Sequence, residues 1–284
     1  MISVGLIGLG RTGAEVAKGI IKHPKLSLVM VVCSPKSPKI GHDVGEILGI
    51  RSQGVLIQGS TQLETEIRRA QPDVIIDFSS PEACLNNLPV VVQQRKPMII
   101  GTTGFTEEQV QYFSHLASRY RTSIVYAPNL SLGINVLMAL IRRAAEVLGD
   151  WDIEIIETHH RHKKDAPSGT ALKIGQVLSE RLGVSSDNIT FGHERMGQRP
   201  SDRIAIHAVR GGGVVGIHQV LFISENEKLE IKHESLNRMA FVDCLTRVIH
   251  YVVTHRADFY TVEDILGLNE PVHCIEKEYA VVAQ

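Results

Sequence analysis

Through its first 130 residues the chain alternates short apolar runs with helical patterns. This alternation is typical of a parallel α/β sheet, because strands covered by helices on both faces are apolar along their whole length. The expected strands are Val4–Ile7, Leu28–Val32, Val55–Ile57, Val74–Phe78, Met98–Ile100 and Ile124–Tyr126. Helix-capping residues are expected at three of the intervening helix starts: Ser80-Pro81, Thr61…Glu64 and Thr106…Gln109. The first part of the chain is therefore predicted to form a Rossmann-like, α/β dinucleotide-binding domain.

After Asn129 the pattern changes to that of an α+β domain built on a mixed sheet. A helix over Gly133–Leu148 should end at Gly149, and a second helix should carry Ala171, Ile174, Leu178 and Leu182 on one face. The expected strands are Trp151–Thr158, Arg203–Arg210, Val214–Ser224 and Leu229–Glu234. The links Gly211–Gly213 and Glu225–Lys228 are short, which predicts an antiparallel hairpin at each.

These patterns predict two domains in the 284 residues. A dinucleotide-binding domain is expected over residues 1–130, completed by about 240–284, where Ala240–Thr254 has the pattern of a closing helix. Residues 131–240 are expected to form the second domain, which would bind the substrate.

Composition and charge exclude several classes of protein. The formal net charge of −1 gives no overall indication of a nucleic-acid or membrane partner, and no apolar run approaches the ~18 residues of a membrane span. The N-terminus is apolar but lacks the basic segment of a signal peptide. The cysteines are widely spaced, as expected for reduced thiols: Cys33, Cys84, Cys244 and Cys274. We therefore expect a soluble, cytoplasmic protein.

A glycine-rich loop, Gly8-Leu9-Gly10-Arg11-Thr12-Gly13, follows the first expected strand and opens a helix. Glycines in this G-x-G-x-x-G spacing let backbone N–H groups approach a pyrophosphate, which then lies on the helix N-terminus. The alternative is that these glycines only form a tight turn.

The end of the second strand bears on which dinucleotide is bound. An Asp or Glu there normally holds the ribose hydroxyls of NAD, but Val32–Lys36 contains no carboxylate. Ser34 and Lys36 are therefore predicted to contact the cofactor, with NADPH preferred and NADH possible. The alternative is that Pro35 and Pro38 direct the nearby lysines into solvent.

A second loop that could bind a ligand, Gly101-Thr102-Thr103-Gly104-Phe105, follows the fifth expected strand. The carboxyl ends of parallel strands are where open α/β sheets bind ligands. A plain turn before the capped helix is an equally simple interpretation.

The densest chemical signal is a basic segment, His159–Lys164, with three histidines, one arginine and two lysines. A helix N-terminus at Ser168-Gly169-Thr170 follows it, and such a terminus attracts anions. The segment could therefore hold a carboxylate or phosphate, and its His and Lys side chains could donate a proton. A solvated basic face is the main alternative. We expect no metal here, because the neighbouring Arg and Lys side chains would repel a dication, and a nucleic-acid patch would be more extended. His207, His218 and His233 are interpreted as structural.

The segment from Glu157 to Ala171, E-x-H-H-x-x-K-x-D-x-P-S-G-T-A, resembles the signature of the dihydrodipicolinate reductase family. The resemblance extends over residues 2 to about 268 and includes Ile76–Ser79, Gly101–Phe105, Ala127–Asn135 and Arg210–His218. The glycine loop is one residue shorter than the family's usual G-x-x-G-R-M-G, the acidic ribose partner is missing, and Asn269–Gln284 extends past the family's usual end.

The resemblance implies NAD(P)H-dependent reduction of a small dicarboxylate, 4-hydroxy-tetrahydrodipicolinate or dihydrodipicolinate, to tetrahydrodipicolinate in the diaminopimelate route to lysine. It implies that His159 and Lys163 are the acid/base pair and that His160, Gly169 and Thr170, beside Ser168, contact substrate carboxylates. It also implies a homotetramer built through the sheets of the second domain. The positions that match dinucleotide contacts are Gly101, Thr102, Thr103, Ala127, Pro128, Asn129 and Leu130. Two alternatives stay open: a related amino-acid or imine dehydrogenase, and a non-catalytic dinucleotide-sensing protein.

Overall fold

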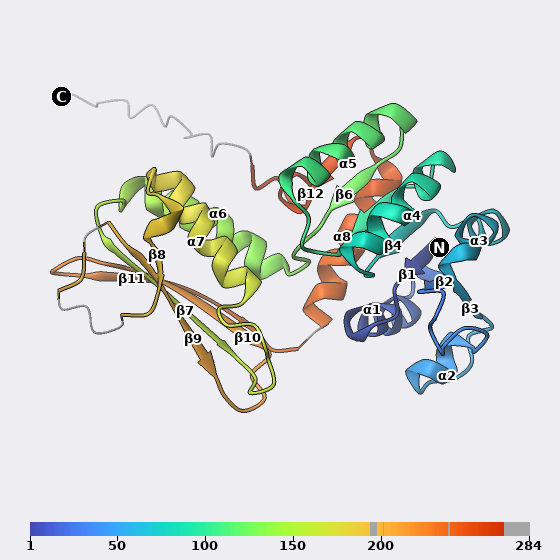
Figure 1. Cartoon of the computed structure of the whole chain (residues 1–284), viewed down its shortest axis with the longest axis horizontal. Coiled ribbons are helices and arrows are strands. Elements are labelled where there is room, and N and C mark those ends of the chain that lie inside the picture. The colour runs from blue at the N-terminus through green and yellow to red at the C-terminus, as the bar shows by residue number, and fades with distance from the viewer. Residues whose placement is uncertain (194–197, 201, 238, 270–284) are drawn as a thin grey trace, which may run out of the picture.

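The computed structural model describes residues 1–193, 198–200, 202–237 and 239–269. These residues form two lobes, one built on a seven-stranded sheet and the other on a five-stranded sheet (Figure 1). Within these ranges, no helix combines the length and the apolar character needed to cross a membrane.

The seven-stranded sheet is parallel throughout, with strand order β12-β6-β5-β4-β1-β2-β3. Its strands are β1 (Ile2–Ile7), β2 (Leu26–Cys33), β3 (Ile57–Gly59), β4 (Val74–Asp77), β5 (Met98–Ile100), β6 (Ile124–Tyr126) and β12 (Phe259–Thr261). The order reverses between β1 and β4, so that the carboxyl ends of these strands form the crevice in which such sheets bind ligands. The predicted Rossmann-like fold is confirmed, although the strand predicted at Val55–Ile57 begins two residues later.

Helices cover both faces of this sheet. They are α1 (Arg11–Lys22), α2 (Val44–Leu48), α3 (Leu63–Ala70), α4 (Pro81–Gln93), α5 (Glu107–Tyr120), α8 (Met239–Thr254) and α9 (Val262–Ile265). Neighbouring residues of β4 point into different cores: Ile76 packs with residues of α1 and α8, whereas Ile75 packs with residues of α3, α4 and α5. Burial on both sides explains the continuous apolar strands in the sequence.

Two of the three predicted helix starts are confirmed. The Ser80 side chain caps α4 by accepting from the Ala83 N–H, and Thr106 and Gln109 form the capping box of α5. The capping box predicted at Thr61 and Glu64 is wrong. A 3₁₀ turn, η1 (Ser60–Gln62), takes up Thr61, and α3 begins only at Leu63.

The five-stranded sheet is mixed, with strand order β11-β10-β7-β9-β8. Its strands are β7 (Asp152–His159), β8 (Ile189–Phe191), β9 (Ile204–Arg210), β10 (Gly216–Ile223) and β11 (Lys228–Ser235), with a 3₁₀ turn η2 (Ser186–Asn188) before β8. The helices α6 (Leu132–Val147) and α7 (Gly169–Leu182) pack on one face, over Ile153 and Ile155 of β7. The predicted second fold, an α+β unit on a mixed sheet, is confirmed.

One local prediction in this lobe is wrong. The link Gly211–Gly213 does not close a hairpin, because β7 lies between β9 and β10. This link instead crosses the end of β7, where the Gly211 N–H donates to the His159 carbonyl at 2.9 Å. The helix predicted over Gly133–Leu148 is confirmed as α6 to within one residue at each end, with Leu148 as the C-cap and Gly149 directly after it. The hairpin at Glu225–Lys228 is confirmed by the antiparallel pairing of β10 with β11.

The chain re-enters the first lobe after β11. Helix α8 packs on α1, and β12 pairs with β6 in parallel. The domain limits, 1–130 completed by about 240–284 and 131–240 for the second domain, stay a prediction. Residues 270–284, which include Cys274, lie outside the described residues.

Candidate active site

The glycine loop between β1 and α1 has the geometry of an anion receptor. Gly8 has φ +91°, and a Cβ at Gly13 would lie 2.1 Å from the Gly8 carbonyl oxygen, so both glycines are required by the turn. A Cβ at Gly10 would meet nothing within 4 Å, which leaves open space in front of the backbone. Within the described residues, the first turn of α1 has neither a side-chain cap nor a carboxylate. Its N–H groups therefore remain available to an anion.

Loops at the carboxyl ends of β4, β5 and β6 lie at the same edge of the sheet. The carboxylate of Asp77, which ends β4, is fully buried, and its Oδ1 accepts from the Thr102 hydroxyl at 2.6 Å and from the Ser79 N–H at 3.0 Å. Burial raises the pKa of Asp77 above its usual value, and these hydrogen bonds only partly oppose the shift. Asp77 thus joins the loop after β4 to the loop after β5.

The loop after β2 borders the glycine loop through a lysine. The ammonium group of Lys39 donates to the carbonyl of Leu9, while Ser34 and Lys36 are exposed. Positive charge therefore lies beside the glycine loop, at the place where many dinucleotide-binding proteins carry a carboxylate.

The basic segment begins at the end of β7, where Glu157 and His159 share one face of the strand. Glu157 is fully buried, and its carboxylate bonds to His159 Nδ1, to Arg210 Nη2 at 2.7 Å and to the Ser168 N–H at 3.0 Å. Burial opposes ionisation of Glu157, but these donors outweigh it and hold its pKa below the usual value. An ionised Glu157 only accepts hydrogen bonds, so Nδ1 of His159 carries a proton and Nε2 is left for chemistry.

His159 is itself largely buried, at 9 % exposure. Burial lowers the pKa of its imidazole, and the bond to Glu157 opposes that shift only in part. Nearby, Lys163 Nζ lies 2.8 Å from Asp165 Oδ2, and the hydrogen bond from Lys163 holds the pKa of Asp165 below its usual value. The two side chains predicted to act in acid/base chemistry are therefore paired with different carboxylates, His159 with Glu157 and Lys163 with Asp165.

The N-terminus of α7 follows the basic segment. Ser168 is its N-cap and accepts from the Ala171 N–H at 3.2 Å. A Cβ at Gly169 would meet nothing within 4 Å, and the Thr170 hydroxyl accepts from Asn129 Nδ2 at 3.4 Å. Asn129, which precedes the second lobe, thereby touches the start of α7. Free N–H groups, open space and nearby cations suit a carboxylate.

Two histidines that we interpreted as structural, His218 and His233, line a cavity together with His159. His218 packs edge-on against His159 with ring centroids 5.3 Å apart, and its Nε2 lies 3.3 Å from the Ser168 hydroxyl. Burial lowers the pKa of His218 to about 4, and the charge of His159 adds to this effect. His233 Nε2 lies 3.4 Å from the Ser131 hydroxyl, and burial lowers its pKa as well.

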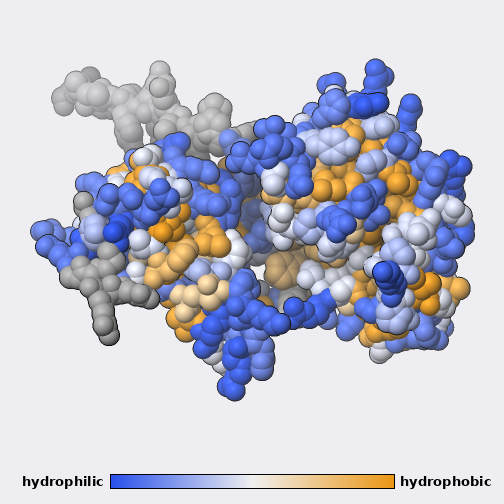
Figure 2. Space-filling view, in the orientation of Figure 1, coloured by the Kyte–Doolittle hydropathy of each residue, from blue (hydrophilic) through white to orange (hydrophobic). Residues whose placement is uncertain are grey.

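Two adjoining cavities of about 450 and 920 Å³ lie at these residues, in the hollow between the lobes (Figure 2). The smaller cavity is bordered by Arg11 and Thr12 of the glycine loop, and the larger by Thr103 and Pro128 of the loops after β5 and β6. The residues that line both are Asn129, His159, Lys163, Asp165 and Thr170. One continuous cleft therefore connects the dinucleotide loops with the basic segment.

The structure brings most of the predicted site residues to this cleft, but not all of them. Ser34 and Lys36 lie outside both cavities, at the end of β2. Ala127 and Leu130 are buried in the core of the first lobe, and the Thr102 hydroxyl points to Asp77. The side chains at these three positions therefore do not line the cleft.

Four residues that line the cleft or form hydrogen bonds that hold it in place were not predicted from the sequence. They are Glu157, Arg210, His218 and His233. A period of two along β7 places Glu157 on the face of His159, so this pair could have been found. The other three come from β9, β10 and β11, whose order in the sheet the sequence did not reveal.

Comparisons with known proteins give a consistent result. The family model "Dihydrodipicolinate reductase, N-terminus" matches residues 2–130, and "Dihydrodipicolinate reductase, C-terminus" matches residues 133–266. The chain is similar to the 4-hydroxy-tetrahydrodipicolinate reductase of Methanocaldococcus jannaschii, with 38 % identity over 95 % of this chain and 99 % of the relative. It is also similar to the Methanopyrus kandleri protein of the same name, with 40 % identity over 94 % of this chain and 97 % of the relative.

Solved structures agree with these matches. A dipicolinate-bound dihydrodipicolinate reductase from Paenisporosarcina sp. TG-14 superimposes with a TM-score of 0.74 and 30 % identity, covering 93 % of this chain and 99 % of that one. An amine dehydrogenase from Mycobacterium smegmatis, at 13 % identity and a TM-score of 0.63 over 92 % of this chain and 95 % of that one, shares the fold alone.

Proposed function

This chain belongs to the dihydrodipicolinate reductase family, and we propose that His159 and Lys163 are its proton donors in the reduction of a dicarboxylate within the cleft. It is an NAD(P)H-dependent oxidoreductase that reduces 4-hydroxy-tetrahydrodipicolinate or dihydrodipicolinate to tetrahydrodipicolinate, in the diaminopimelate route of lysine biosynthesis. The observation that carries the site assignment is the cleft itself, where the dinucleotide loops and the basic segment meet.

The glycine loop fits a dinucleotide because Gly10 leaves open space before uncapped N–H groups of α1. A nicotinamide cofactor supplies the hydride when it is bound. Hydride addition leaves negative charge on the substrate, and a positioned acid that quenches it contributes about 10²–10⁴-fold to the rate. Glu157 holds Nδ1 of His159, so that Nε2 is the nitrogen that delivers a proton. A substrate with two negative charges also raises the pKa of His159 and favours its protonated form.

The substrate's carboxylates are proposed to bind at the N-terminus of α7. Gly169 and Thr170 offer backbone N–H groups, Thr170 adds a hydroxyl, and His160 lines the same cavity. Ser168 contributes chiefly as the cap, because its N–H is already donated to Glu157. This arrangement explains why a basic segment ends at a helix start.

NADPH is proposed as the preferred cofactor. The β2 end has no carboxylate to repel a 2′-phosphate, and Lys36 and Lys39 bring positive charge to that edge. Ser34 is exposed and can donate to a phosphate oxygen.

We further propose a homotetramer assembled through the second sheet. Helices α6 and α7 cover one face of that sheet, whereas Val209 of β9, which points to the other face, is 46 % exposed. Sedimentation equilibrium should give four times the 31.3 kDa chain mass, and a monomer mass would exclude this assembly.

A cytoplasmic location is also proposed, since the described cysteines Cys33, Cys84 and Cys244 are free thiols and buried. Cell fractionation tests it.

The function is tested by one assay. The purified chain is supplied with the product of the preceding synthase step and NADPH, and the loss of nicotinamide absorbance is followed. Rapid, substrate-dependent oxidation of NADPH is expected. Reduction of amino acids or imines instead would favour a related dehydrogenase, and binding of NADPH without turnover would favour a sensing protein.

A further inference from the structure

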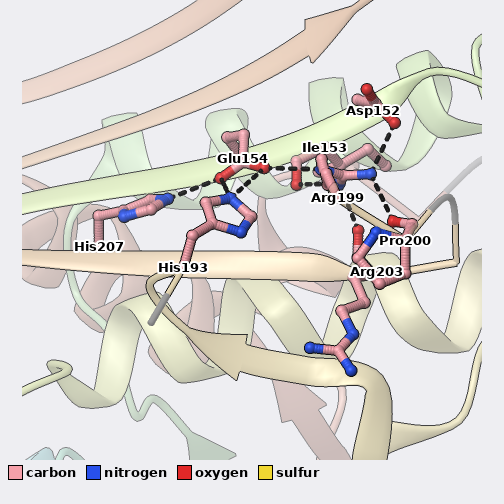
Figure 3. Close-up of polar contacts among 8 residues, drawn as sticks. All are labelled: Asp152, Ile153, Glu154, His193, Arg199, Pro200, Arg203 and His207. Carbon is pink, nitrogen blue, oxygen red and sulfur yellow. Dashed lines mark hydrogen bonds and ion pairs between the residues drawn. The ribbon is translucent and has the colours of Figure 1, made fainter. Parts of the chain in front are cut away.

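Strand β7 carries a second polar cluster on the face opposite Glu157 and His159. Its side chains alternate, so Ile153 and Ile155 enter the core under α6 and α7, while Glu154 points to the other face of the sheet. There the carboxylate of Glu154 lies 2.6 Å from Nε2 of His207 on β9, and 3.0 Å from Nε2 of His193, which follows β8 (Figure 3).

The three side chains converge as metal ligands do. One oxygen of Glu154 and one nitrogen each of His193 and His207 all lie within 4.8 Å of one another. Ligand atoms about 2.0–2.2 Å from a tetrahedral zinc ion stand roughly 3.3 Å apart. Because His207 and His193 now approach Glu154 at hydrogen-bond distances, an ion requires a small outward movement of two half-exposed imidazoles.

Arg199 shows how the charge of this cluster is arranged. Its Nε lies 2.9 Å from Oε1 of Glu154, and its Nη1 lies 2.6 Å from the carboxylate of Asp152. Asp152 and Glu154 carry two negative charges against the one positive charge of Arg199. These three side chains therefore keep a net negative charge that can attract a cation. Arg199 occupies Oε1, whereas His207 approaches Oε2. A ligating carboxylate is commonly held by such a hydrogen bond on its other oxygen.

We propose that Glu154, His193 and His207 bind one divalent transition-metal ion of the zinc class. Two imidazoles and one carboxylate suit zinc, cobalt or nickel, whereas magnesium and calcium require oxygen ligands. In the single chain the side chains of His193 and His207 are 37 % and 32 % exposed, which leaves room there for a water molecule as a fourth ligand. The ion would fasten the chain after β8 to β7 and β9, away from the reductase cleft.

The test uses the full chain, treated with a chelator and titrated with zinc chloride in a calorimeter. One zinc ion per chain is expected at this site. Glu154→Gln keeps the shape of the side chain and one acceptor oxygen but removes its charge. It should weaken zinc binding at least about 100-fold, since even partners of metal ligands are worth about 10–100-fold. His207→Ala should have a similar effect.

The basic segment supplies the matched control, because it holds other histidines that could take up zinc. The double variant His160→Ala/His162→Ala should retain zinc binding. If this control loses the ion while Glu154→Gln binds it normally, or if zinc does not bind to the wild type, the proposal is wrong. Cobalt gives a second measurement: its visible absorption should report nitrogen and oxygen ligands in the wild type and disappear in Glu154→Gln. Thermal unfolding of each metal-free variant checks folding, and the more exposed His193→Ala replaces any variant that does not fold.

Discussion

Glu157 and His159 lie two residues apart on one face of β7, and the buried carboxylate of Glu157 is hydrogen-bonded to Nδ1 of His159. Arg210 and the Ser168 N–H bind the same carboxylate, so it is held from three sides. Glu157 therefore links β7, β9 and the start of α7 to the orientation of a single imidazole.

Glu157→Gln should lower kcat by about 10²-fold, the lower end of what a general acid contributes, and leave NADPH affinity unchanged. Loss of the negative charge lowers the pKa of His159 further, so the alkaline limb of the kcat profile should move to lower pH. Steady-state kinetics across pH measure both effects. The control is Glu180→Gln on the exposed surface of α7. A variant with lower kcat but an unmoved pH profile would assign Glu157 a purely structural role.

Lys163→Ala and His159→Gln should each lower turnover strongly while leaving dinucleotide affinity nearly unchanged. Both side chains line the cleft at the basic segment, and neither belongs to the glycine loop. Turnover with the family substrate and NADPH binding by fluorescence are the two measurements. Wild-type turnover in either variant would remove that residue from the acid/base pair.

Features that depend on local backbone geometry were predictable from the sequence. The Gly8–Gly13 loop was predicted because its glycines are tied to local backbone geometry: Gly8 has a positive φ, and Gly13 packs against the turn. The order of β7, β9 and β10 was not predictable, because strand neighbours depend on contacts between distant residues. A short link between β9 and β10 suggested a hairpin, yet β7 is inserted between them.

The same limit applied to the site. His159 and Lys163 stood out because they lie in one continuous segment. His218 was interpreted as structural because nothing in its own strand indicates that His159 lies beside it.

Thr170→Val should chiefly weaken substrate binding. Its hydroxyl lies at the first turn of α7, facing the cleft beside Asn129. A lost hydrogen bond to a charged carboxylate costs roughly 1.5–3 kcal/mol, which raises KM about tenfold or more. Thr170→Ser, which keeps the hydroxyl, is the control. An unchanged KM in the valine variant would contradict the carboxylate assignment.

His218 should make the folded protein less stable in mild acid. Burial lowers its pKa from 6.5 to about 4, so the unfolded chain binds a proton between these values and the folded chain does not. The contribution of neutral His218 to the free energy of unfolding is fully present above pH 6.5 and is lost as the pH falls toward 4. The loss amounts to about 3 kcal/mol, because each unit of pKa shift is worth about 1.36 kcal/mol. His218→Gln should lose less stability over this range. Urea unfolding at pH 7 and pH 4.5 gives the difference, and equal losses in both proteins would show that His218 is not responsible.

Cofactor choice should respond differently to the two lysines after β2. The wild type should use NADPH at least as well as NADH, because the end of β2 carries no carboxylate to repel a 2′-phosphate. Lys36 is exposed, so Lys36→Ala should lower the ratio of kcat/KM for NADPH to that for NADH while leaving NADH kinetics unchanged. Lys39 also donates to the Leu9 carbonyl, so Lys39→Ala should weaken the binding of both dinucleotides by loosening the glycine loop. A wild type that favours NADH tenfold would contradict the NADPH assignment, and an unchanged ratio in Lys36→Ala would place the charge that selects the phosphate elsewhere. The two variants together separate recognition of the phosphate from support of the glycine loop, because only Lys39→Ala should change the kinetics with NADH.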